Sequence, residues 1–419
     1  MSIEATDSMF FSILSQYSWF FFQICDIFKW FVCLLDVSME IAKTTKTIDD
    51  SIESLKNSPI FAMSLSSKEL FHSNFWTWLM EQDSEFIKCF FPSDDLSGEN
   101  GIRILREKEH MDIQIQIGRG RAIRKYVIEN KFKSIPTENQ LREYAGAEGF
   151  EKGVLTGISK EPPFKLPENW TYLSYDSYDP YDCICTRLEN QLDNTKNDNL
   201  KENKDIVTQY IEMTRNLVSL IKAFLYGYGE RWLFPDIIPE EIKNLRIDDV
   251  IQKMQAEKFL HYFRKNSRYK RDLFVEKDGY TLIVGTDMRH ATSLFDVLYK
   301  ESREGKEIGI QIQNKEFRWF VNAEDNRNLG EVFGDERYDS WFDREFVARS
   351  GTISTPKLTN LGKKLTSLGG KGNVYRKFAP NFICQYFTLS EDELEFQKLV
   401  ELIDLFLDAA SEVIRAPGR

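Results

Sequence analysis

The sequence is poor in histidine, in paired cysteines and in surplus positive charge, and each shortage excludes a class of protein. Four histidines among 419 residues are too few for a histidine-rich metal centre. The cysteines include one close pair, Cys183 and Cys185, with no second pair to complete a zinc site. Any bound metal should therefore have oxygen ligands, which favours Mg²⁺ or Mn²⁺. Unpaired, scattered cysteines are also typical of a cytoplasmic protein with reduced thiols.

A surplus of basic residues is missing as well. The formal net charge is -11, which excludes a protein that coats nucleic acid through a broad positive surface. A local basic cleft is compatible with this charge. Hydrophobic residues make up 42% of the chain, enough for two or three compact units and too many for a disordered protein.

A long uninterrupted hydrophobic run is also absent. Residues 9–37 are intensely aromatic, but Asp26 and Lys29 interrupt them, and two glutamines lie within the remainder. The apolar part is shorter than the roughly 20 residues that a membrane span needs. We expect a buried or amphipathic helix and no membrane partner, with a single anchor or an extension upstream of Met39 as open alternatives.

Hydrophobic periodicity predicts a first unit with a helix, three strands, a helix and two further strands. The strands before the second helix should form an antiparallel meander, because the turn-forming "GRGR" joins the last two. The expected elements are a helix over 64–82, strands over 102–107, 111–118 and 125–131, a helix opened by Pro136, and strands over 153–159 and 169–178.

A polar stretch over 188–205 should link this unit to a long amphipathic helix over 205–228. The C-terminal part predicts a second mixed unit, and "GGKGN" over 369–373 predicts a flexible loop because it lacks the spacing of a nucleotide-binding loop. Its expected elements are helices over 248–266 and 390–414 and strands over 279–285, 307–313, 316–322 and 380–388.

These patterns divide the chain into four parts. We expect an N-terminal helical extension over 1–58, an α/β core over 59–187, a linker and long helix over 188–247, and a C-terminal α+β unit over 248–419.

The strand "YVIENK" carries an acid and a base where it should be most buried. Because side chains alternate along a strand, Glu129 and Lys131 point to the same face, and Ile128 points to the opposite one. Asp112 lies near the start of the hairpin partner. If the two strands pair, both carboxylates meet beside an ammonium group, with the carbonyl of Asn130 as a third oxygen ligand. Such a pocket suits a divalent ion and phosphodiester hydrolysis, in which Lys131 would orient the attacking water.

This pattern resembles the PD-(D/E)XK nuclease superfamily, and is closest to a bacterial and phage-associated group of it. The resemblance rests on Asp112, on Glu129-Asn130-Lys131 across a hairpin, on Gln140 in the next helix and on Glu69 in the preceding one. It covers about residues 60–180 and departs from the superfamily's name at Met111, where a proline would stand. It says nothing specific about the C-terminal half.

The resemblance implies a restriction-endonuclease-like core, a mixed central sheet flanked by helices, and an enzyme that hydrolyses nucleic acid with Mg²⁺, DNA being favoured over RNA. Asp112 and Glu129 would bind the metal, Lys131 would serve the nucleophilic water, Glu69 would add an acidic ligand and Gln140 would support the site. A role in defence, restriction or mobile-element biology and a homodimer are further implications.

Each of these residues also has a simpler structural explanation. Glu-x-Lys on a strand is commonly a surface ion pair, and Glu69 is also expected from helix capping. His72 is interpreted as a hydrogen-bonded packing residue, and Tyr144 as packing its helix onto the sheet. The alternative to a nuclease is a nucleic-acid-binding or structural module that has the fold without the reaction.

Two basic stretches are candidates for contacts with a phosphate backbone, with solubility as the simpler explanation. The candidate nucleic-acid-binding residues are Arg119, Arg121, Arg124, Lys125, Arg264, Lys265, Arg268 and Lys270.

Overall fold

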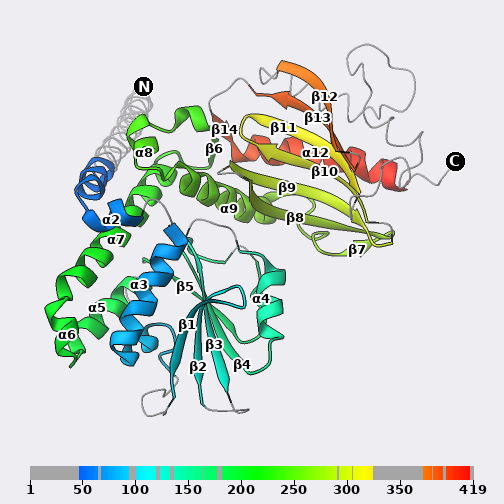
Figure 1. The fold of residues 1–419 in the computed structure, drawn as a ribbon. Coiled ribbons are helices and arrows are strands. Elements are labelled where there is room, and N and C mark those ends of the chain that lie inside the picture. The colour runs from blue at the N-terminus through cyan, green and yellow to red at the C-terminus, as the bar shows by residue number, and fades with distance from the viewer. Residues whose placement is uncertain are drawn as a thin grey trace, which may run out of the picture.

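The chain forms two units, each built around a sheet (Figure 1). The computed structural model describes residues 47–64, 68–93, 101–118, 123–132, 136–162, 164–176, 182–289, 292–303, 305–323, 371–379, 381–389 and 393–415. The expected helix over 9–37 lies outside these residues. No helix within the described ranges is long and apolar enough to cross a membrane.

The first sheet has the order β1-β2-β3-β4-β5 and is mixed. The antiparallel meander predicted for its first three strands is confirmed, whereas β3, β4 and β5 run parallel. A parallel connection needs a crossover, which α4 (Glu138–Ala145) supplies between β3 and β4. The strands are β1 (Arg103–Lys108), β2 (Met111–Ile117), β3 (Arg124–Lys131), β4 (Phe150–Gly157) and β5 (Trp170–Ser174).

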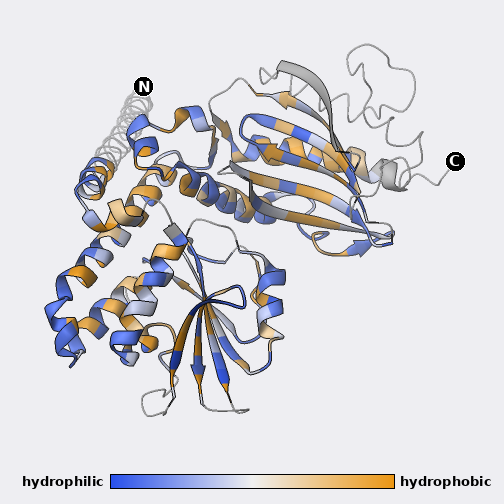
Figure 2. Ribbon diagram, viewed as in Figure 1, coloured by the Kyte–Doolittle hydropathy of each residue, from blue (hydrophilic) through white to orange (hydrophobic). Residues whose placement is uncertain are grey.

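Helices cover both faces of this sheet, so the unit is a mixed α/β structure with a flanked central sheet (Figure 1). Alternate residues of β2 and β3, among them Ile113 and Ile128, join the larger hydrophobic core with α3 (Lys68–Gln82). Residues on the opposite face, among them Val127, join a smaller core with α4. Figure 2 shows hydrophobic and hydrophilic residues in turn along the strands. Because side chains alternate along the strands, both faces of the sheet are buried. The charged residues of the candidate site lie at the ends of the strands.

The polar stretch over 188–205, predicted as a link, is mostly helical. Leu188 and Leu192 are buried one turn apart on one helix and Leu200 is buried on the next, which makes these polar segments amphipathic. The larger core runs from Ile52 to Met254 and includes them. The helical elements here are α2 (Pro59–Ser64), the 3₁₀-helix η1 (Ser84–Cys89), α5 (Ile184–Asn194), α6 (Asp198–Glu202), α7 (Lys204–Gly227), the 3₁₀-helix η2 (Pro235–Ile237) and α8 (Glu240–Asn244).

The second sheet has the order β12-β13-β11-β10-β9-β8-β7, and its paired neighbours are antiparallel. Its hairpin at Asn314 was predicted, but β9 was missed, and "GGKGN" is not wholly a loop because β12 begins at Lys371. Both β9 and β12 are held by hydrogen bonds to neighbouring strands, and the local sequence pattern does not show which strands will be neighbours. The strands are β7 (Glu276–Lys277), β8 (Tyr280–Arg289), β9 (Thr292–Glu301), β10 (Lys306–Gln313), β11 (Glu316–Ala323), β12 (Lys371–Ala379) and β13 (Phe382–Thr388).

One helix, α9 (Asp248–Asn266), belongs to both units and has the bounds that the sequence predicted. Met254 on it joins the larger core of the first unit. Phe259 and Phe263 join the core beneath the second sheet, where α12 (Phe396–Arg415) also packs. A small antiparallel pair, β6 (Arg231–Leu233) with β14 (Glu393–Glu395), also joins chain regions far apart in sequence.

Candidate active site

Three of the predicted residues lie together at one end of β2 and β3. Ile113 on β2 pairs with Ile128 on β3. The next position outward therefore sets Asp112 opposite Glu129, on the face that α4 covers. Lys131 follows on the same face because side chains alternate along a strand.

Hydrogen bonds tie these groups to one another. The Asn130 N–H donates to Asp112 Oδ2 at 2.7 Å, and the Asp112 N–H lies 3.5 Å from Glu129 Oε2. Lys131 Nζ is 2.8 Å from Glu129 Oε1. The two carboxyl groups thus share one small region with a single ammonium group.

Gln140 reaches the same place from α4. Thr137 caps this helix by accepting a hydrogen bond from the Gln140 N–H, which fixes its first turn over the sheet. Gln140 Nε2 donates to Glu129 Oε1 at 2.9 Å and to Tyr144 Oη at 2.8 Å. The Tyr144 hydroxyl in turn donates to the His110 carbonyl. Tyr144, interpreted from sequence as packing only, therefore also fixes the site.

Burial makes the two carboxyl groups weak acids. Desolvation and the neighbouring charge of Glu129 raise the pKa of Asp112 to about 8, although Lys131 and the Asn130 N–H oppose the shift. Burial also raises the pKa of Glu129, again against Lys131. For Lys131, burial alone would lower the pKa, but the surrounding acids, Glu129 first, raise it. The site therefore has fewer positive charges than its acids need to be fully ionised.

Glu69 lies in the first turn of α3, half-buried. Its charge raises the pKa of Asp112, Glu129 and Lys131, which places it in the electrostatic neighbourhood of the site. Among the described residues, no three His, Cys, Asp or Glu side chains gather as metal ligands. The structure therefore does not bring Glu69 into one such group with Asp112 and Glu129.

The oxygen donors present nevertheless fit Mg²⁺, which is bound by one or two carboxylates and keeps several waters. Asp112 Oδ1 accepts no hydrogen bond from any residue that the structure describes. The N–H and C=O of one strand residue point to the same side. Because the Asn130 N–H points at Asp112, its carbonyl also faces this region, whereas the Glu129 carbonyl accepts from Thr156 on β4.

The Asn130 side chain has a role that the sequence did not reveal. It is fully buried on the opposite face, where its amide donates to Ser73 Oγ at 2.9 Å. Its carbonyl oxygen accepts from Thr156 at 2.9 Å and from Tyr175 at 2.8 Å. These bonds attach the residue between Glu129 and Lys131 to α3, β4 and the end of β5.

Lys253 on α9 is a second residue that the sequence analysis missed. It is buried, and its Nζ donates to the Lys131 carbonyl at 2.8 Å and lies 3.5 Å from the Phe132 carbonyl. No local pattern could indicate a partner more than a hundred residues away.

His72 has the packing role expected for it. Its ring is buried, stacks on Phe132 with centroids 4.3 Å apart, and bonds Tyr210 Oη through Nδ1 at 2.6 Å.

The candidate nucleic-acid contacts differ in their surroundings. Arg119 and Arg121 lie outside the described residues. Arg124 and Lys125 begin β3, and Lys125 forms an ion pair with Glu109 at 3.2 Å.

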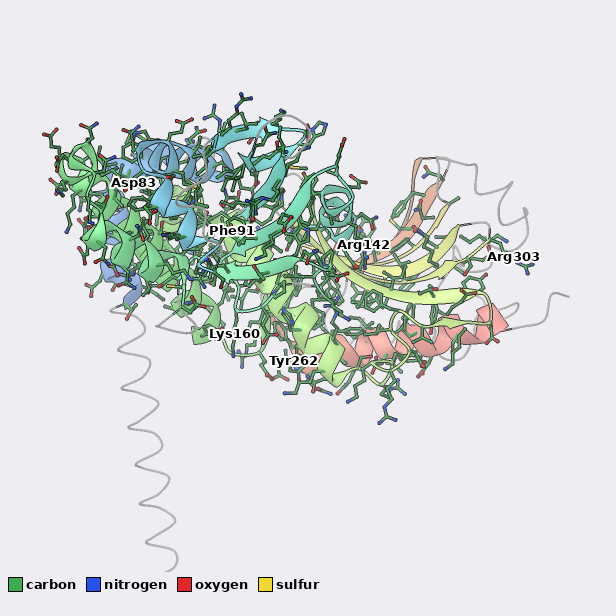
Figure 3. The ribbon with its side chains drawn as sticks, turned by 90° about the horizontal axis from the view of Figure 1, so that it is seen from below. Asp83, Phe91, Arg142, Lys160, Tyr262 and Arg303 are labelled. Carbon is green, nitrogen blue, oxygen red and sulfur yellow. The ribbon has the colours of Figure 1, made fainter. Side chains whose placement is uncertain are left out.

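The second basic stretch lies on and after α9, in the second unit. Arg264 lies over the ring of Phe274, and Arg268 pairs with Asp404 and Asp408. Lys265 and Lys270 are exposed. Acidic and basic side chains are mixed over the visible surface (Figure 3).

No protein-family model matches this chain, and no curated protein or solved structure matches it either.

Proposed function

We propose that this chain is a Mg²⁺-dependent nuclease that hydrolyses phosphodiester bonds, with DNA as its substrate, on a restriction-endonuclease-like core. One observation carries the proposal: Asp112, Glu129 and Lys131 converge at one end of two paired strands, with both carboxyl pKa values raised.

The order of elements supports the proposed core. A helix precedes the meander, the active strand β3 is central, and a helix crosses over to a parallel strand beside it. Glu69 and Gln140, which come from the two flanking helices, both act on the strand acids.

Each residue has a definite task in this proposal. Asp112, Glu129 and the Asn130 carbonyl would hold Mg²⁺, which neutralises charge on a phosphate and lowers the pKa of a bound water. Lys131 would hold the attacking water and stabilise the hydroxide formed from it. Gln140 fixes the Glu129 carboxylate through Oε1, and Tyr144 fixes Gln140.

Cleavage assays with the purified chain test the proposal. Linear, circular and single-stranded DNA and RNA are incubated with Mg²⁺, Mn²⁺ or chelator. We expect metal-dependent cutting of DNA that Asp112→Asn and Lys131→Met each reduce by at least about a hundredfold. Asp272→Asn and Lys277→Met, which alter an exposed pair 2.9 Å apart, should retain full activity. Cutting that persists in both site variants would refute the proposal.

The Lys131–Glu129 contact at 2.8 Å favours a second candidate, a nucleic-acid-binding module in which these residues form only an ion-pair network. This candidate predicts unchanged DNA affinity in chelator and no cleavage with either metal. Affinity measured in parallel with cleavage separates the two candidates.

A further inference from the structure

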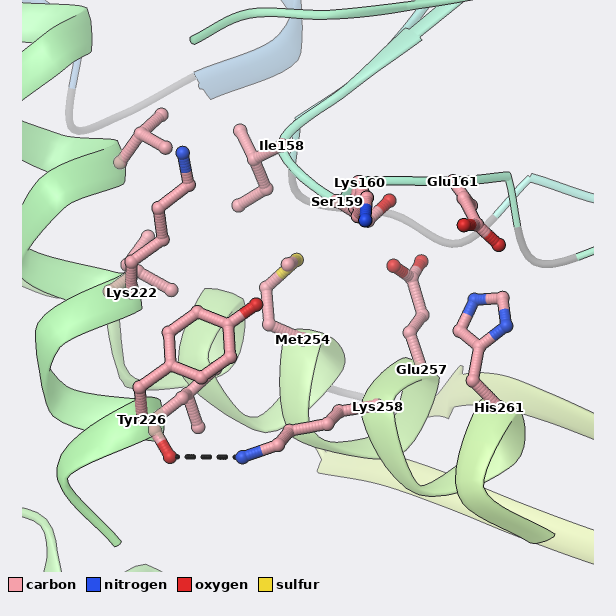
Figure 4. A pocket seen from close by; sticks show the side chains of 13 residues that line it. Ile158, Ser159, Lys160, Glu161, Lys222, Tyr226, Met254, Glu257, Lys258 and His261 are labelled. Atoms are coloured by element: carbon pink, nitrogen blue, oxygen red, sulfur yellow. Dashed lines mark hydrogen bonds between the residues drawn. The ribbon is translucent and has the colours of Figure 1, made fainter. Parts of the chain in front are cut away.

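A cavity of about 240 Å³ lies between α7, α9 and the segment that follows β4 (Figure 4). Its lining includes none of the acids or lysines of the candidate active site. Apolar side chains form most of its wall, together with the ring of Tyr226. These apolar residues are Ile158, Val218, Ile221, Leu225 and Met254.

Glu257 on α9 borders this cavity and is the group that most needs explanation. It is 2% exposed, and its Oε2 accepts no hydrogen bond from any residue that the structure describes. Burial raises its pKa, although Lys253, one turn earlier, and the Ser159 hydroxyl oppose the shift. An unsatisfied buried acceptor is destabilising, so native structures normally give it a partner.

The charges around the cavity are unevenly placed. Glu161 and His261 lie beside Glu257, while Lys222 projects from the opposite side (Figure 4). Burial lowers the pKa of His261, so its ring is neutral at neutral pH. The Lys258 ammonium is already engaged, since it donates to the Leu225 carbonyl at 3.1 Å and to the Gly229 carbonyl. Lys160, an exposed residue next to Ser159, also lines this side of the cavity. The buried Glu257 carboxyl group therefore borders the apolar wall with Glu161, His261 and Lys160 around it.

We propose that this cavity binds a small organic cation with an apolar body and an amine, amidine or guanidine head that donates to Glu257. The positive head would favour the ionised carboxylate, whose proton passes to solvent, and would give it the missing partner, while the body would lie against Met254 and Ile158. Ser159 Oγ lies 2.9 Å from Tyr172 Oη, so Ser159 retains a partner when the head approaches Glu257. The inference does not depend on the nuclease proposal.

Three probes with one ring and different heads test the proposal on the full chain. Benzamidine carries a cationic head, benzamide a neutral head of the same shape, and benzoate an anionic head. We expect calorimetric titration to give benzamidine a Kd about tenfold lower than that of benzamide, with benzoate weakest, because a charge-assisted hydrogen bond is the stronger one. Equal or tighter binding of benzamide or benzoate, or no binding of benzamidine, would overturn the proposal.

Variants locate the binding within the cavity. Glu257→Gln should abolish the preference for benzamidine over benzamide, whereas Glu161→Gln, at an exposed acid of the same lining, should leave it intact. Ile221→Phe, which fills the apolar wall, should weaken all three probes, and it provides a second variant if Glu257→Gln does not fold. A preference that survives Glu257→Gln, or affinities that Ile221→Phe leaves unchanged, would place the binding elsewhere and refute the assignment.

Discussion

At the residue scale, the candidate site has more acidic groups than positive charges to neutralise them. Asp112, which is half-buried, and Glu129, which is buried, lie next to each other, and Lys131 supplies one nearby positive charge. Two weak acids with one ammonium group are destabilising unless a proton or a cation joins them. A divalent cation would displace the proton and allow both acids to ionise, which makes metal binding measurable as stability.

Asp112→Asn should therefore separate stability from metal binding. In chelator, the variant should be at least as stable as the natural chain, because asparagine brings no second charge beside Glu129. Magnesium at a hundred times its Kd should add about 2.7 kcal/mol to the natural chain and nothing to the variant. Calorimetric melting with and without Mg²⁺ measures both effects, with Asp272→Asn as the exposed control. A full magnesium response in Asp112→Asn would contradict this prediction.

His72 gives a pH-dependent prediction at the same scale. Burial lowers its pKa to about 3 from an ordinary value of 6.5. Between these two values the histidine is protonated in the unfolded chain and neutral in the folded one. Its contribution to stability is complete above pH 6.5 and is lost as the pH falls toward 3, at about 1.4 kcal/mol per pH unit. Urea unfolding between pH 4 and 7 should show this loss in the natural chain.

His72→Gln provides the comparison, because an amide can bond Tyr210 without titrating in this range. Other groups contribute equally to both proteins, so the difference in unfolding free energy should change in favour of the variant as the pH falls below 6.5. A difference that stays constant from pH 7 to 4 would refute the assignment.

At the scale of elements, the sequence predicted those whose own residues carry the signal. The strands of the meander alternate, Pro136 marks the start of α4, and α9 was predicted with its observed bounds. The strand β9 was missed. It forms hydrogen-bonded ladders with β8 on one side and β10 on the other, and these ladders hold it in the extended conformation. Local pattern thus predicted the elements that carry their own signal, but neither β9 nor the partners that order it.

The candidate site divides in the same way. The convergence of Asp112, Glu129 and Lys131 follows from alternation and one hairpin, both readable locally. The bonds of the Asn130 amide to Ser73 and of Lys253 to β3 join segments far apart in the chain. Such partners depend on tertiary packing, which spacing alone does not determine.

Gly153 on β4 is paired with Trp170 on β5, and the Trp170 ring lies directly over it. A methyl group at this position would lie 2.5 Å from the Trp170 ring, too close for any real contact. Gly153→Ala should therefore destabilise the chain by about 1–3 kcal/mol through overpacking. Gly285→Ala on β8 meets no atom within 4 Å and is the matched control. Urea unfolding of both variants tests the difference, and equal stabilities would show that β5 moves aside without penalty.

At the scale of the whole molecule, α9 is the element that joins the second unit to the candidate site. One part of it packs in the larger core and another beneath the second sheet. Within the first of these parts, next to Met254, Lys253 donates a hydrogen bond to the carbonyl of Lys131. Because the ammonium of Lys131 must stand at a fixed place for the proposed reaction, Lys253 should act as a positioning residue.

Lys253→Met tests this link, because methionine keeps an apolar stem and removes the donor. We expect kcat for DNA cleavage to fall about tenfold to a hundredfold with KM unchanged, since a small displacement of a catalytic group slows the chemical step without weakening substrate binding. Lys258→Met removes the α9 lysine that donates to the carbonyls of Leu225, in the last turn of α7, and of Gly229, just after it, and should leave kcat unchanged.

Stability distinguishes positioning from general damage. Lys253→Met removes the positive charge that acts on the buried Glu257 carboxyl group, so the single variant should lose stability. The double variant Lys253→Met/Glu257→Gln should regain part of it, because it also removes that carboxyl group. Because neither change restores the bond to the Lys131 carbonyl, kcat should stay low in the double variant. Lys253→Arg keeps a donor at this position and should therefore have a kcat between those of Lys253→Met and the natural chain. Recovery of kcat together with stability in the double variant would show that α9 supports the fold but does not place Lys131.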